Sequence, residues 1–499
     1  MTNALYEALF APHRESERVF VHNGNEPLTF GAFVERAAQV AAVLRNQGVQ
    51  PGDRLVAQVG KSVSALAVYA GCVQAGVVYL PINTAYTPTE VDYFLADSGA
   101  RLMLCDPEFV GRRAGVRMLA LSADGRAGEF ADAISATEPN WAVTPRGSGD
   151  LAALLYTSGT TGRSKGAMLS HDNLLSNARV LADAWQFTTD DVLLHALPIF
   201  HTHGLFVATN IALLSGASMI FEPKFDLDRM IAGLTRATTM MGVPTFYTRL
   251  LDDRRFNPEL VRHMRLFISG SAPLLAETHR QFEERSGHRI LERYGMTETN
   301  MNTSNPMDGE RRAGSVGFPL PGVTLRIAEP DCGDAIPNGE IGQIEVKGPN
   351  VFKGYWNMPE KTAAEFRGDG YFITGDLGRF DEEGYVHIVG RNKDLIISGG
   401  FNIYPKEIEL VLDHQSGVQE SAVIGVPHPD FGEGVLGVLV PNPGATLETE
   451  QMLRDIRTEL AGFKVPRKVL IVDELPRNTM GKVQKNALRE RFNDAFSAA

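Results

Sequence analysis

The chain has 499 residues, of which 43% are hydrophobic and 22% are charged, and these ordinary proportions exclude a disordered or fibrous protein. At about 150 residues per domain, the length predicts two to four domains. The net charge is −12, from 48 Lys and Arg against 60 Asp and Glu. We therefore expect no nucleic acid partner, because a nucleic-acid binder needs a basic face.

The cysteines and the N-terminal residues indicate in which cellular compartment the protein is found. The chain has three cysteines, Cys72, Cys105 and Cys332, and no pair with zinc or redox spacing. A sparse, odd set is typical of a reducing compartment. The first twenty residues lack the basic and apolar regions of a signal peptide. No apolar run approaches the roughly 18 residues that a membrane span needs. We expect a cytoplasmic protein without a membrane partner.

From about residue 30 to residue 300, apolar runs alternate with segments of helical periodicity. Residues 54–59 and 78–82 are predicted to be buried strands, and residues 62–76 between them a helix that ends at Gly76. Residues 173–185 form another helical segment. This alternation predicts an α/β fold, in which parallel-rich sheets are flanked by helices.

The pattern changes after about residue 315. Residues 315–390 contain short alternating strands separated by Gly, Asp and Asn, which predict antiparallel hairpins or a small β-barrel-like subdomain. We expect an N-terminal domain at 1–390, a boundary at 391–394, and a small α+β domain at 395–499. The elements predicted for that last domain are strands at 420–426, 435–440 and 468–473 and a helix at 447–461.

A segment rich in glycine and hydroxyl side chains follows the apolar run LAALLY. It spans Tyr156 to Gly166 and reads YTSGTTGRSKG. Glycines allow backbone N–H groups to converge on phosphate oxygens, and hydroxyls and cations add donors. The segment is not a Walker loop, because Lys165 is followed by Gly rather than Ser or Thr. Its place after a buried strand favours a ligand loop over a surface turn.

This segment resembles the phosphate loop of the adenylate-forming superfamily, which comprises acyl-CoA synthetases, nonribosomal adenylation domains and luciferases. Six further segments are similar to that superfamily in the expected order. They are LPIFHTHG (197–204), ISGSAPL (268–274), ERYGMTET (292–299), YFITGDLG (371–378), GRNKDLIISGGFNIYPKEIE (390–409) and PRNTMGKVQK (476–485). The resemblance covers nearly the whole chain. It implies a large N-terminal portion and a mobile C-terminal domain that carries the catalytic lysine.

The resemblance also implies the chemistry. A carboxylate attacks the α-phosphate of ATP to give an acyl-adenylate and pyrophosphate, and a coenzyme A thiol then displaces AMP. Such a transfer depends on positioning and electrostatics. The implied phosphate ligands are Thr157, Ser158, Gly159, Thr160, Thr161, Gly162 and Lys165. Glu298, with Thr157, would hold Mg²⁺, and Thr297 would bond the α-phosphate.

The same motifs imply a nucleoside site. Asp376 would accept hydrogen bonds from the ribose hydroxyls, and Arg391 would support that sugar. The residues expected beside adenine are Ser271, Ala272, Pro273, Tyr294 and Gly295.

Three further roles are implied for the C-terminal region. Lys482, in a locally basic segment, would be the catalytic cation that bridges the substrate carboxylate and the α-phosphate. Lys485 is the nearby alternative, and a solvated basic helix end is the alternative reading of the whole segment. Lys393 would be the hinge between two domain orientations. Gly399 and Gly400 would face the coenzyme A channel.

Arg293 indicates which acid is bound. A buried guanidinium needs an anionic partner and suits a carboxylate, and the reacting carboxylate already has Lys482. Arg293 would therefore bind a second carboxylate, unless it forms a structural ion pair with Glu292 or another acid. The residues around it, with FHTHGLF at 200–206, are similar to malonyl-CoA synthetases. This resemblance implies malonate, and also methylmalonate, as substrates, in a pocket formed by Arg293, His201, Ser271 and Met301.

Other interpretations remain open. His171, His195, His201 and His203 could bind a metal, but nothing else indicates a transition-metal site. We expect His201 to line the acyl pocket and act near the reacting carboxylate, and His203 to serve packing or polar support. The alternatives for the whole chain are a ligase for another short acid, an amino-acid-adenylating module that loads a carrier protein, and a non-catalytic nucleotide-binding protein.

Overall fold

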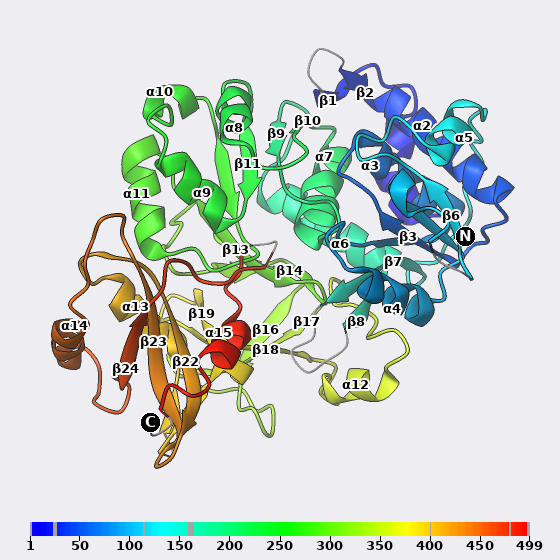
Figure 1. Ribbon diagram of the computed structural model, residues 1–499. Coiled ribbons are helices and arrows are strands. Elements are labelled where there is room, and N and C mark those ends of the chain that lie inside the picture. Colours follow the sequence, from blue (N-terminus) through cyan, green and yellow to red (C-terminus); the bar gives the residue numbers. More distant parts are fainter. Residues whose placement is uncertain are drawn as a thin grey trace. The chain divides into compact units, whose positions relative to one another are not determined.

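The computed structural model describes residues 2–22, 27–112, 115–157, 164–399, 401–478 and 481–496. The chain forms two compact units, each built from more than one stretch of sequence (Figure 1). Unit 1 comprises Met1–Thr324 and Val346–Phe372, and unit 2 comprises Leu325–Glu345 and Ile373–Ala499. The predicted hinge at 391–394 concerns motion and stays a prediction.

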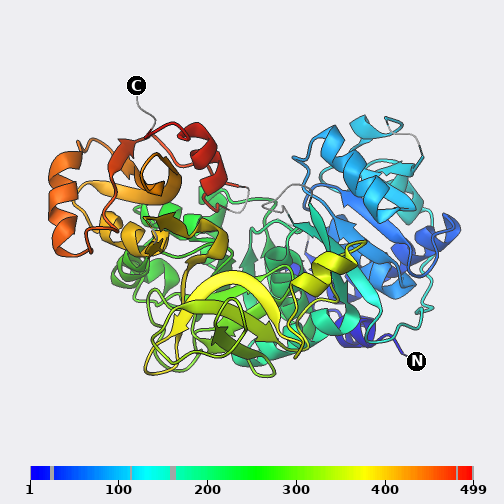
Figure 2. The same ribbon diagram turned by 90° about the horizontal axis from the view of Figure 1, so that it is seen from below.

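Unit 1 contains a six-stranded sheet in the order β6-β5-β3-β4-β7-β8. Every pairing is parallel except that of β7 with β8, which form an antiparallel hairpin. Helices α2, α3 and α5 lie beside this sheet in both ribbon views (Figures 1 and 2). The strands are β3 (Arg54–Gln58), β4 (Val78–Pro81), β5 (Leu102–Cys105), β6 (Arg117–Ala120), β7 (Leu151–Thr157) and β8 (Lys165–Ser170).

Helix α3 (Val63–Ala75) shows how local sequence sets these boundaries. The Ser62 hydroxyl accepts a hydrogen bond from the Ala65 N–H and caps the first turn, and Gly76 ends the helix at φ +72°. Almost every side chain of α3 is buried, which agrees with its continuously apolar sequence. The predicted helix and the strands on either side of it are confirmed.

Unit 1 also contains a nine-stranded sheet in the order β15-β14-β13-β12-β11-β9-β10-β1-β2. Its centre is parallel, and β14, β15 and β2 at the edges pair antiparallel. The strands are β1 (Val19–His22), β2 (Leu28–Thr29), β9 (Val192–His195), β10 (Ser218–Phe221), β11 (Thr239–Gly242), β12 (Leu266–Ser269), β13 (Leu291–Met296), β14 (Asn300–Ser304) and β15 (Phe318–Pro319).

The other helices of unit 1 connect and cover these strands. Helix α6 (His171–Ala184) confirms the predicted helical segment, and η3 (His203–Thr209) is a π-helix, a rare form that often marks functional sites. The remaining α-helices are α1 (Ala4–Leu9), α2 (Phe30–Asn46), α4 (Pro88–Ser98), α5 (Glu129–Ser135), α7 (Asn210–Ser215), α8 (Leu227–Leu234), α9 (Pro244–Leu251), α10 (Pro258–Val261), α11 (Ala276–Ser286) and α12 (Pro359–Ala364). Short 3₁₀ turns are η1 (Ala11–His13) and η2 (Pro107–Phe109).

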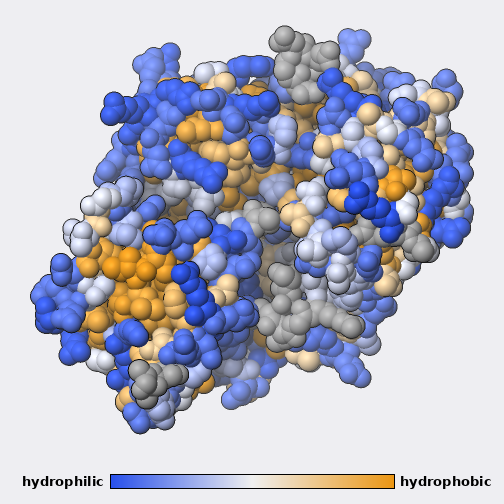
Figure 3. Space-filling model, viewed as in Figure 1, coloured by the Kyte–Doolittle hydropathy of each residue, from blue (hydrophilic) through white to orange (hydrophobic). Residues whose placement is uncertain are grey.

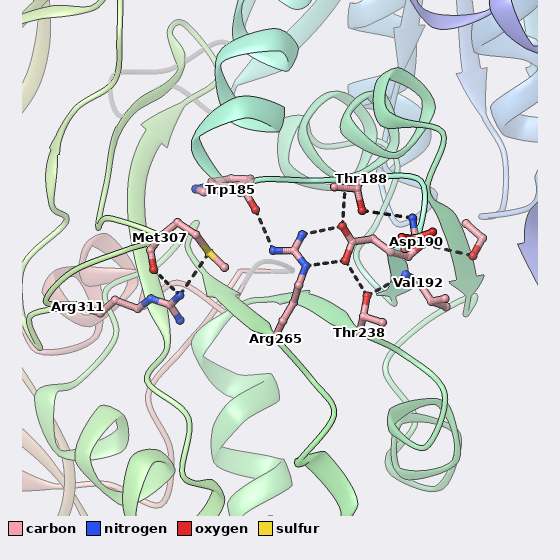
Figure 4. Close-up of polar contacts among 10 residues, drawn as sticks. Trp185, Thr188, Asp190, Val192, Thr238, Arg265, Met307 and Arg311 are labelled. Carbon is pink, nitrogen blue, oxygen red and sulfur yellow. Dashed lines mark hydrogen bonds and ion pairs between the residues drawn. The ribbon is translucent and has the colours of Figure 1, made fainter.

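A buried ion pair joins the N-terminal ends of β9, β11 and β12. Arg265 binds Asp191 through two hydrogen bonds of 2.6 and 2.7 Å, and donates a third to the Trp185 carbonyl at 3.0 Å (Figure 4). Thr238 donates to Asp191 at 2.8 Å and accepts from the Val192 N–H at 2.9 Å. Since Asp191 is 3% exposed, these contacts replace the water that its carboxylate loses on folding.

Unit 2 is built on two sheets. The first has the order β16-β17-β18-β19, and its β18 and β19 pair antiparallel, as predicted for this region. The second has the order β21-β20-β23-β22, with β24 parallel to β23. The strands are β16 (Thr324–Ala328), β17 (Gly342–Lys347), β18 (Phe372–Phe380), β19 (Val386–Arg391), β20 (Ile396–Ser398), β21 (Phe401–Ile403), β22 (Val418–His428), β23 (Gly432–Pro441) and β24 (Lys468–Ile471).

The second sheet of unit 2 has an apolar core on each face. Along β22, Val423 packs into a cluster with Ile408 and Leu412 of α13, whereas Ile424 packs into a cluster with Leu488 of α15. This division follows from the alternation of side chains along a strand. The helices of unit 2 are α13 (Pro405–Asp413), α14 (Thr449–Asp455) and α15 (Lys485–Arg491), with 3₁₀ turns η4 (Asn392–Asp394) and η5 (Ile456–Thr458).

The predicted α-helix at 447–461 is too long. The α-helical part ends at Asp455 and continues as the 3₁₀ turn η5. Apolar side chains also reach the surface of unit 2, where orange atoms gather at the lower left of Figure 3. Phe401 and Phe463 are 53% and 38% exposed and stack with ring centroids 4.6 Å apart. This unit therefore carries an apolar surface that its own residues do not cover.

Among the described residues, no helix is both long and apolar enough to cross a membrane.

The Asp191–Arg265 pair predicts a stability effect. Asp191→Ala should lower the free energy of unfolding by about 2–4 kcal/mol, because it leaves a largely buried guanidinium without its carboxylate. Urea denaturation measures this difference. Asp228→Ala is the control, because Asp228 is 83% exposed in its contact with Arg255, and a change within about 0.5 kcal/mol is expected there. Equal effects of the two substitutions would contradict a stabilising role of the buried pair.

Candidate active site

The candidate site of unit 1 lies where parallel strands end. Strands β9, β11, β12 and β13 are neighbours in one sheet. His201 and Ser271 lie beyond the carboxyl ends of β9 and β12, and Arg293 directly follows the part of β13 that pairs parallel with β12. Ligands of open α/β sheets bind at this edge. The sheet therefore brings together three residues that the sequence separates by nearly a hundred positions.

Arg293 is buried and forms no ion pair with the residues that the structure describes. Its side chain is 3% exposed, and its Nε and Nη2 atoms have no hydrogen-bond partner among the described residues. The Glu292 carboxylate instead accepts from the Leu274 N–H at 3.1 Å. Burial lowers the pKa of Arg293 to about 9, so the guanidinium is still charged at pH 7. The alternative of a structural ion pair with Glu292 is not what the structure shows.

Gly270 provides the space for this guanidinium. A Cβ atom at this position would lie 2.4 Å from Cζ of Arg293, closer than carbon atoms approach. The next residue, Ser271, has φ +70°, a backbone conformation that is rare for residues other than glycine. Backbone strain of this kind is concentrated at functional sites.

Two histidines lie beside Arg293. Burial and then the charge of Arg293 lower the pKa of His201 to about 4, and the same two causes lower that of His203. Nδ1 of His203 lies 3.1 Å from the Ser271 hydroxyl, whereas its Nε2 is buried with no partner among the described residues. If the hydroxyl donates to Nδ1, Nε2 carries the proton. A second unused donor thus lies near Arg293.

The β13–β14 hairpin holds the next group of predicted residues. Tyr294 and Gly295 lie in β13, and the turn that follows contains Thr297 and Glu298. A Cβ atom on Gly295 would lie 1.9 Å from the Asn300 carbonyl oxygen, so only glycine fits this hairpin.

Met301 lies on β14, the other strand of the same hairpin. It is 2% exposed, and Asn177 holds its backbone with a donated hydrogen bond of 3.0 Å and an accepted one of 3.2 Å. Ala272 is half-buried and Pro273 is exposed, in the segment after Ser271.

Lys165 and Glu298 come from different sheets and are joined by two residues. Nζ of Lys165 lies 3.2 Å from Oε1 of Glu365 and 4.1 Å from the ring centroid of Tyr355. The Tyr355 hydroxyl lies 2.6 Å from Oε2 of Glu365 and 3.0 Å from Oε1 of Glu298. Thr157 pairs with Lys165 across the β7–β8 hairpin.

Some predicted residues cannot be placed. The phosphate-loop residues Ser158, Gly159, Thr160, Thr161 and Gly162, and the channel residue Gly400, lie outside the described residues.

The residues present fit Mg²⁺ better than a transition metal. No group of three or more His, Cys, Asp or Glu within the described ranges could hold a metal ion, so the histidine cluster does not form such a site there. Mg²⁺ needs only one or two carboxylates when substrate phosphates supply further oxygens. Glu298, 6% exposed in a tight turn, can be such a ligand.

The second cluster of predicted residues lies in unit 2. Asp376 and Arg391 are partners across β18 and β19, with Nε of Arg391 2.6 Å from Oδ1 of Asp376. Burial, and then the charge of Arg391, lower the pKa of Lys482 to about 8. Burial also lowers the pKa of Lys393, in η4. Unit 2 therefore collects three predicted cationic residues around the Asp376 carboxylate.

The basic segment after residue 476 is not a solvated helix end. Arg477 is paired with Glu420, Lys485 lies 2.5 Å from Glu409, and Arg489 lies 2.7 Å from Asp394. No ion pair of Lys482 occurs within the part of the chain that the structure describes. The Lys485 ammonium is thus committed to a structural pair, which favours Lys482 as the functional cation.

Gly399 adopts φ +57°, and its N–H donates to the Phe431 carbonyl at 2.9 Å. A Cβ atom there would lie 3.2 Å from the Phe431 ring. The position therefore needs glycine for its conformation.

Sequence reasoning missed Tyr355 and Glu365 and gave His203 only a supporting role. Glu365 is 200 residues from Lys165, so no spacing rule connects the two. The buried tyrosine in KGYWNMPEKTAAEF, followed by two acids and a lysine, is the only signal the sequence offered. The unused Nε2 of His203 is visible only in three dimensions.

Comparison with known proteins agrees with this geometry. Residues 10–356 match the family model of the AMP-binding enzymes, and residues 407–482 match that of the AMP-binding enzyme C-terminal domain. The chain belongs to the AMP-binding enzyme family. The predicted membership of the adenylate-forming superfamily and the α/β fold with a small C-terminal domain are confirmed.

Several relatives of this AMP-binding enzyme are similar over two thirds or more of its length. ATP-bound MatB from Rhodopseudomonas palustris is 56% identical with a TM-score of 0.97, and each chain is covered to 100%. Feruloyl-CoA synthase from an Amycolatopsis species is 38% identical over 97% of both chains. Malonate–CoA ligase from Arabidopsis thaliana is 40% identical over 69% of this chain and 61% of its own.

Proposed function

We propose that this AMP-binding enzyme is an acid–thiol ligase that joins malonate to coenzyme A, with ATP converted to AMP and pyrophosphate. The observation that carries the choice of acid is the buried guanidinium of Arg293, which has no acidic partner in the described part of the chain. The similarity to proteins named MatB and malonate–CoA ligase supports the same choice. A cytosolic location fits three cysteines that form no disulfide.

A dicarboxylic acid satisfies the groups at this site. One carboxylate of malonate would accept hydrogen bonds from Nε and Nη2 of Arg293 and from Nε2 of His203. Charge-assisted bonds of this kind are about twice as strong as neutral ones. His201 would form the wall beside them. The second carboxylate, one methylene away, would then be the reacting one.

The first half-reaction forms one bond and breaks another. An oxygen of the reacting carboxylate bonds to the α-phosphorus, and the bond from that phosphorus to the pyrophosphate oxygen breaks. Lys165, Thr157 and Thr297 would hold the phosphates, and Lys482 would neutralise the oxygens that approach one another. Mg²⁺ held by Glu298 and Thr157 would add positive charge on those phosphates.

The nucleoside would be bound by the remaining predicted residues. Tyr294, Ser271, Ala272, Pro273 and Gly295 would contact adenine, and Asp376 and Arg391 the ribose. In the second half-reaction the coenzyme A thiol would lose its proton and its sulfur would bond to the acyl carbon. The bond from that carbon to the phosphate oxygen of AMP would break, and AMP would leave. Gly399 and Gly400 would lie along the path of the thiol.

An AMP-release assay tests the function. We expect AMP formation that depends on malonate, ATP, Mg²⁺ and coenzyme A, with less activity on monocarboxylic acids. Replacement of coenzyme A by a carrier protein distinguishes the amino-acid-adenylating alternative. Equal activity on acetate and malonate would contradict the proposed substrate, and no acid-dependent AMP formation would contradict the ligase.

Arg293→Leu tests the acid site. Loss of the guanidinium leaves a malonate carboxylate without its partner, so kcat/KM for malonate should fall by about 10²–10³-fold, while MgATP affinity is retained. Steady-state kinetics and calorimetric ATP titration measure the two effects. Arg289→Leu removes a 51% exposed arginine near the same strand and should change neither. Unchanged malonate turnover in Arg293→Leu would remove Arg293 from the acyl site.

Lys482→Ala tests the catalytic cation. Adenylate formation should fall by at least about 10²-fold, because no other charge replaces the ammonium. Conversion of supplied malonyl-adenylate to the thioester should persist. Lys468→Ala, an exposed lysine of the same unit, should leave both half-reactions unchanged. Equal losses in both steps of Lys482→Ala would contradict a role specific to adenylation.

The pKa of Lys482 gives this step a pH dependence. With a pKa of about 8, the ammonium is charged below that pH and is lost as the pH rises through it. Single-turnover adenylation should therefore decline above pH 8 by up to about tenfold per unit. In Lys482→Arg this decline should move to higher pH, since guanidinium stays protonated. A wild-type profile that rises through pH 9 would contradict the assignment.

Lys393→Pro tests the predicted hinge. A proline fixes φ and should restrict the rotation between two domain orientations. We expect slower thioester formation and a nearly normal rate of adenylation, measured as separate half-reactions. Lys393→Ala controls for loss of the side chain. Wild-type rates of both half-reactions in Lys393→Pro would reject a hinge at this residue.

A further inference from the structure

A chain of four polar residues crosses unit 1 from one sheet to the other. Lys165 begins β8 of the six-stranded sheet, and Glu298 lies in the hairpin turn after β13 of the nine-stranded sheet. Glu365, at the end of α12, lies 3.2 Å from Nζ of Lys165. The Tyr355 hydroxyl lies between the carboxylates of Glu365 and Glu298, at 2.6 and 3.0 Å.

The Tyr355 hydroxyl has one proton to share between two carboxylates. The contact with Glu365 is the shorter of the two, so the hydroxyl donates to that carboxylate. The Glu365 carboxylate therefore holds the hydroxyl and, with it, the position of the Tyr355 ring.

Glu365 is ionised in this arrangement. Burial alone would raise its pKa, but Lys361, Tyr355 and Lys165 together lower it below the ordinary value. Lys361 lies 2.8 Å from the same oxygen that contacts Lys165. The Lys165 ammonium can therefore direct its other donors to a phosphate while Glu365 keeps a second positive partner.

The Tyr355 ring limits where the Lys165 ammonium can lie. Nζ is 4.1 Å from the ring centroid, a distance that favours a cation over an aromatic face. A carboxylate at 3.2 Å and a ring at 4.1 Å hold the ammonium from two sides. Lys165 itself is 18% exposed. These contacts reduce the conformational entropy that a free lysine would lose on binding phosphate.

We propose that Glu365 is a positioning residue, which orients Lys165 for the nucleotide phosphates directly and, through the Tyr355 hydroxyl, fixes the aromatic ring beside the Lys165 ammonium. The inference rests on the phosphate role given to Lys165 in the proposed function. Glu365 acts through Lys165 and Tyr355, so its effect depends on both.

Binding of MgATP in the absence of any acid tests the proposal directly. Isothermal titration calorimetry of the full chain should show that Glu365→Gln weakens MgATP binding about tenfold, as expected when a partly buried charge partner is lost. Tyr355→Phe keeps the ring beside the ammonium but removes the hydroxyl. It should weaken MgATP binding less than Glu365→Gln does, because the ring and the carboxylate both remain. Glu360→Gln, the same change at an exposed residue of α12, should leave MgATP binding unchanged.

A double-substitution cycle separates positioning from a structural role. Glu365→Gln should weaken MgATP binding in the wild-type background but have almost no further effect in Lys165→Ala. An equal loss in both backgrounds, or unchanged binding in Glu365→Gln, would overturn the proposal. Because no acid is present, this outcome does not depend on malonate being the substrate. Absence of MgATP binding by the wild-type chain would instead contradict the proposed function.

Discussion

Moving a guanidinium from water into a protein interior costs several kcal/mol unless an opposite charge and hydrogen bonds replace the water. The Asp191 carboxylate offsets this cost for Arg265. For Arg293 the cost is not offset within the described residues. Its side chain is 3% exposed, and two of its nitrogen atoms have no hydrogen-bond partner there. The surrounding structure is arranged around that constraint. Gly270 gives the guanidinium space, Ser271 takes a strained conformation, and both neighbouring histidines are kept neutral.

The lysines, like the two arginines, differ in whether a carboxylate of the protein pairs with the charge. Lys485 is paired with Glu409 in unit 2, and Lys165 with Glu365 in unit 1. The first pair joins two helices, α15 and α13. The second has a spare lysine at the same carboxylate, which is unnecessary for a purely structural pair. Within the described residues Lys482 has neither arrangement, and burial, and then the charges of Arg391 and Lys393, lower its pKa.

Much of the fold was predictable from local pattern, and the site was predictable in part. Helix α3 followed from an apolar run closed by Gly76, and β3 and β4 from the runs on either side of it. The predicted helix at 447–461 was too long because periodicity does not distinguish an α-helix from the 3₁₀ turn at 456–458. The pairing of Lys165 with Glu365 could not be predicted, since it joins residues 200 positions apart. Whether Arg293 had an acidic partner was likewise a question of packing.

The contact between Gly270 and Arg293 also restricts the order in which this pocket can change. A Cβ atom at residue 270 would lie 2.4 Å from the guanidinium carbon, so a larger residue at 270 requires the Arg293 side chain to leave the position that it holds here. A chain that loses the arginine first can then fill the vacated volume without this clash. A chain with a filled pocket can place an arginine in this position without the clash only after it has gained the glycine. Both directions of change therefore pass through an intermediate that has glycine at 270 and no arginine at 293.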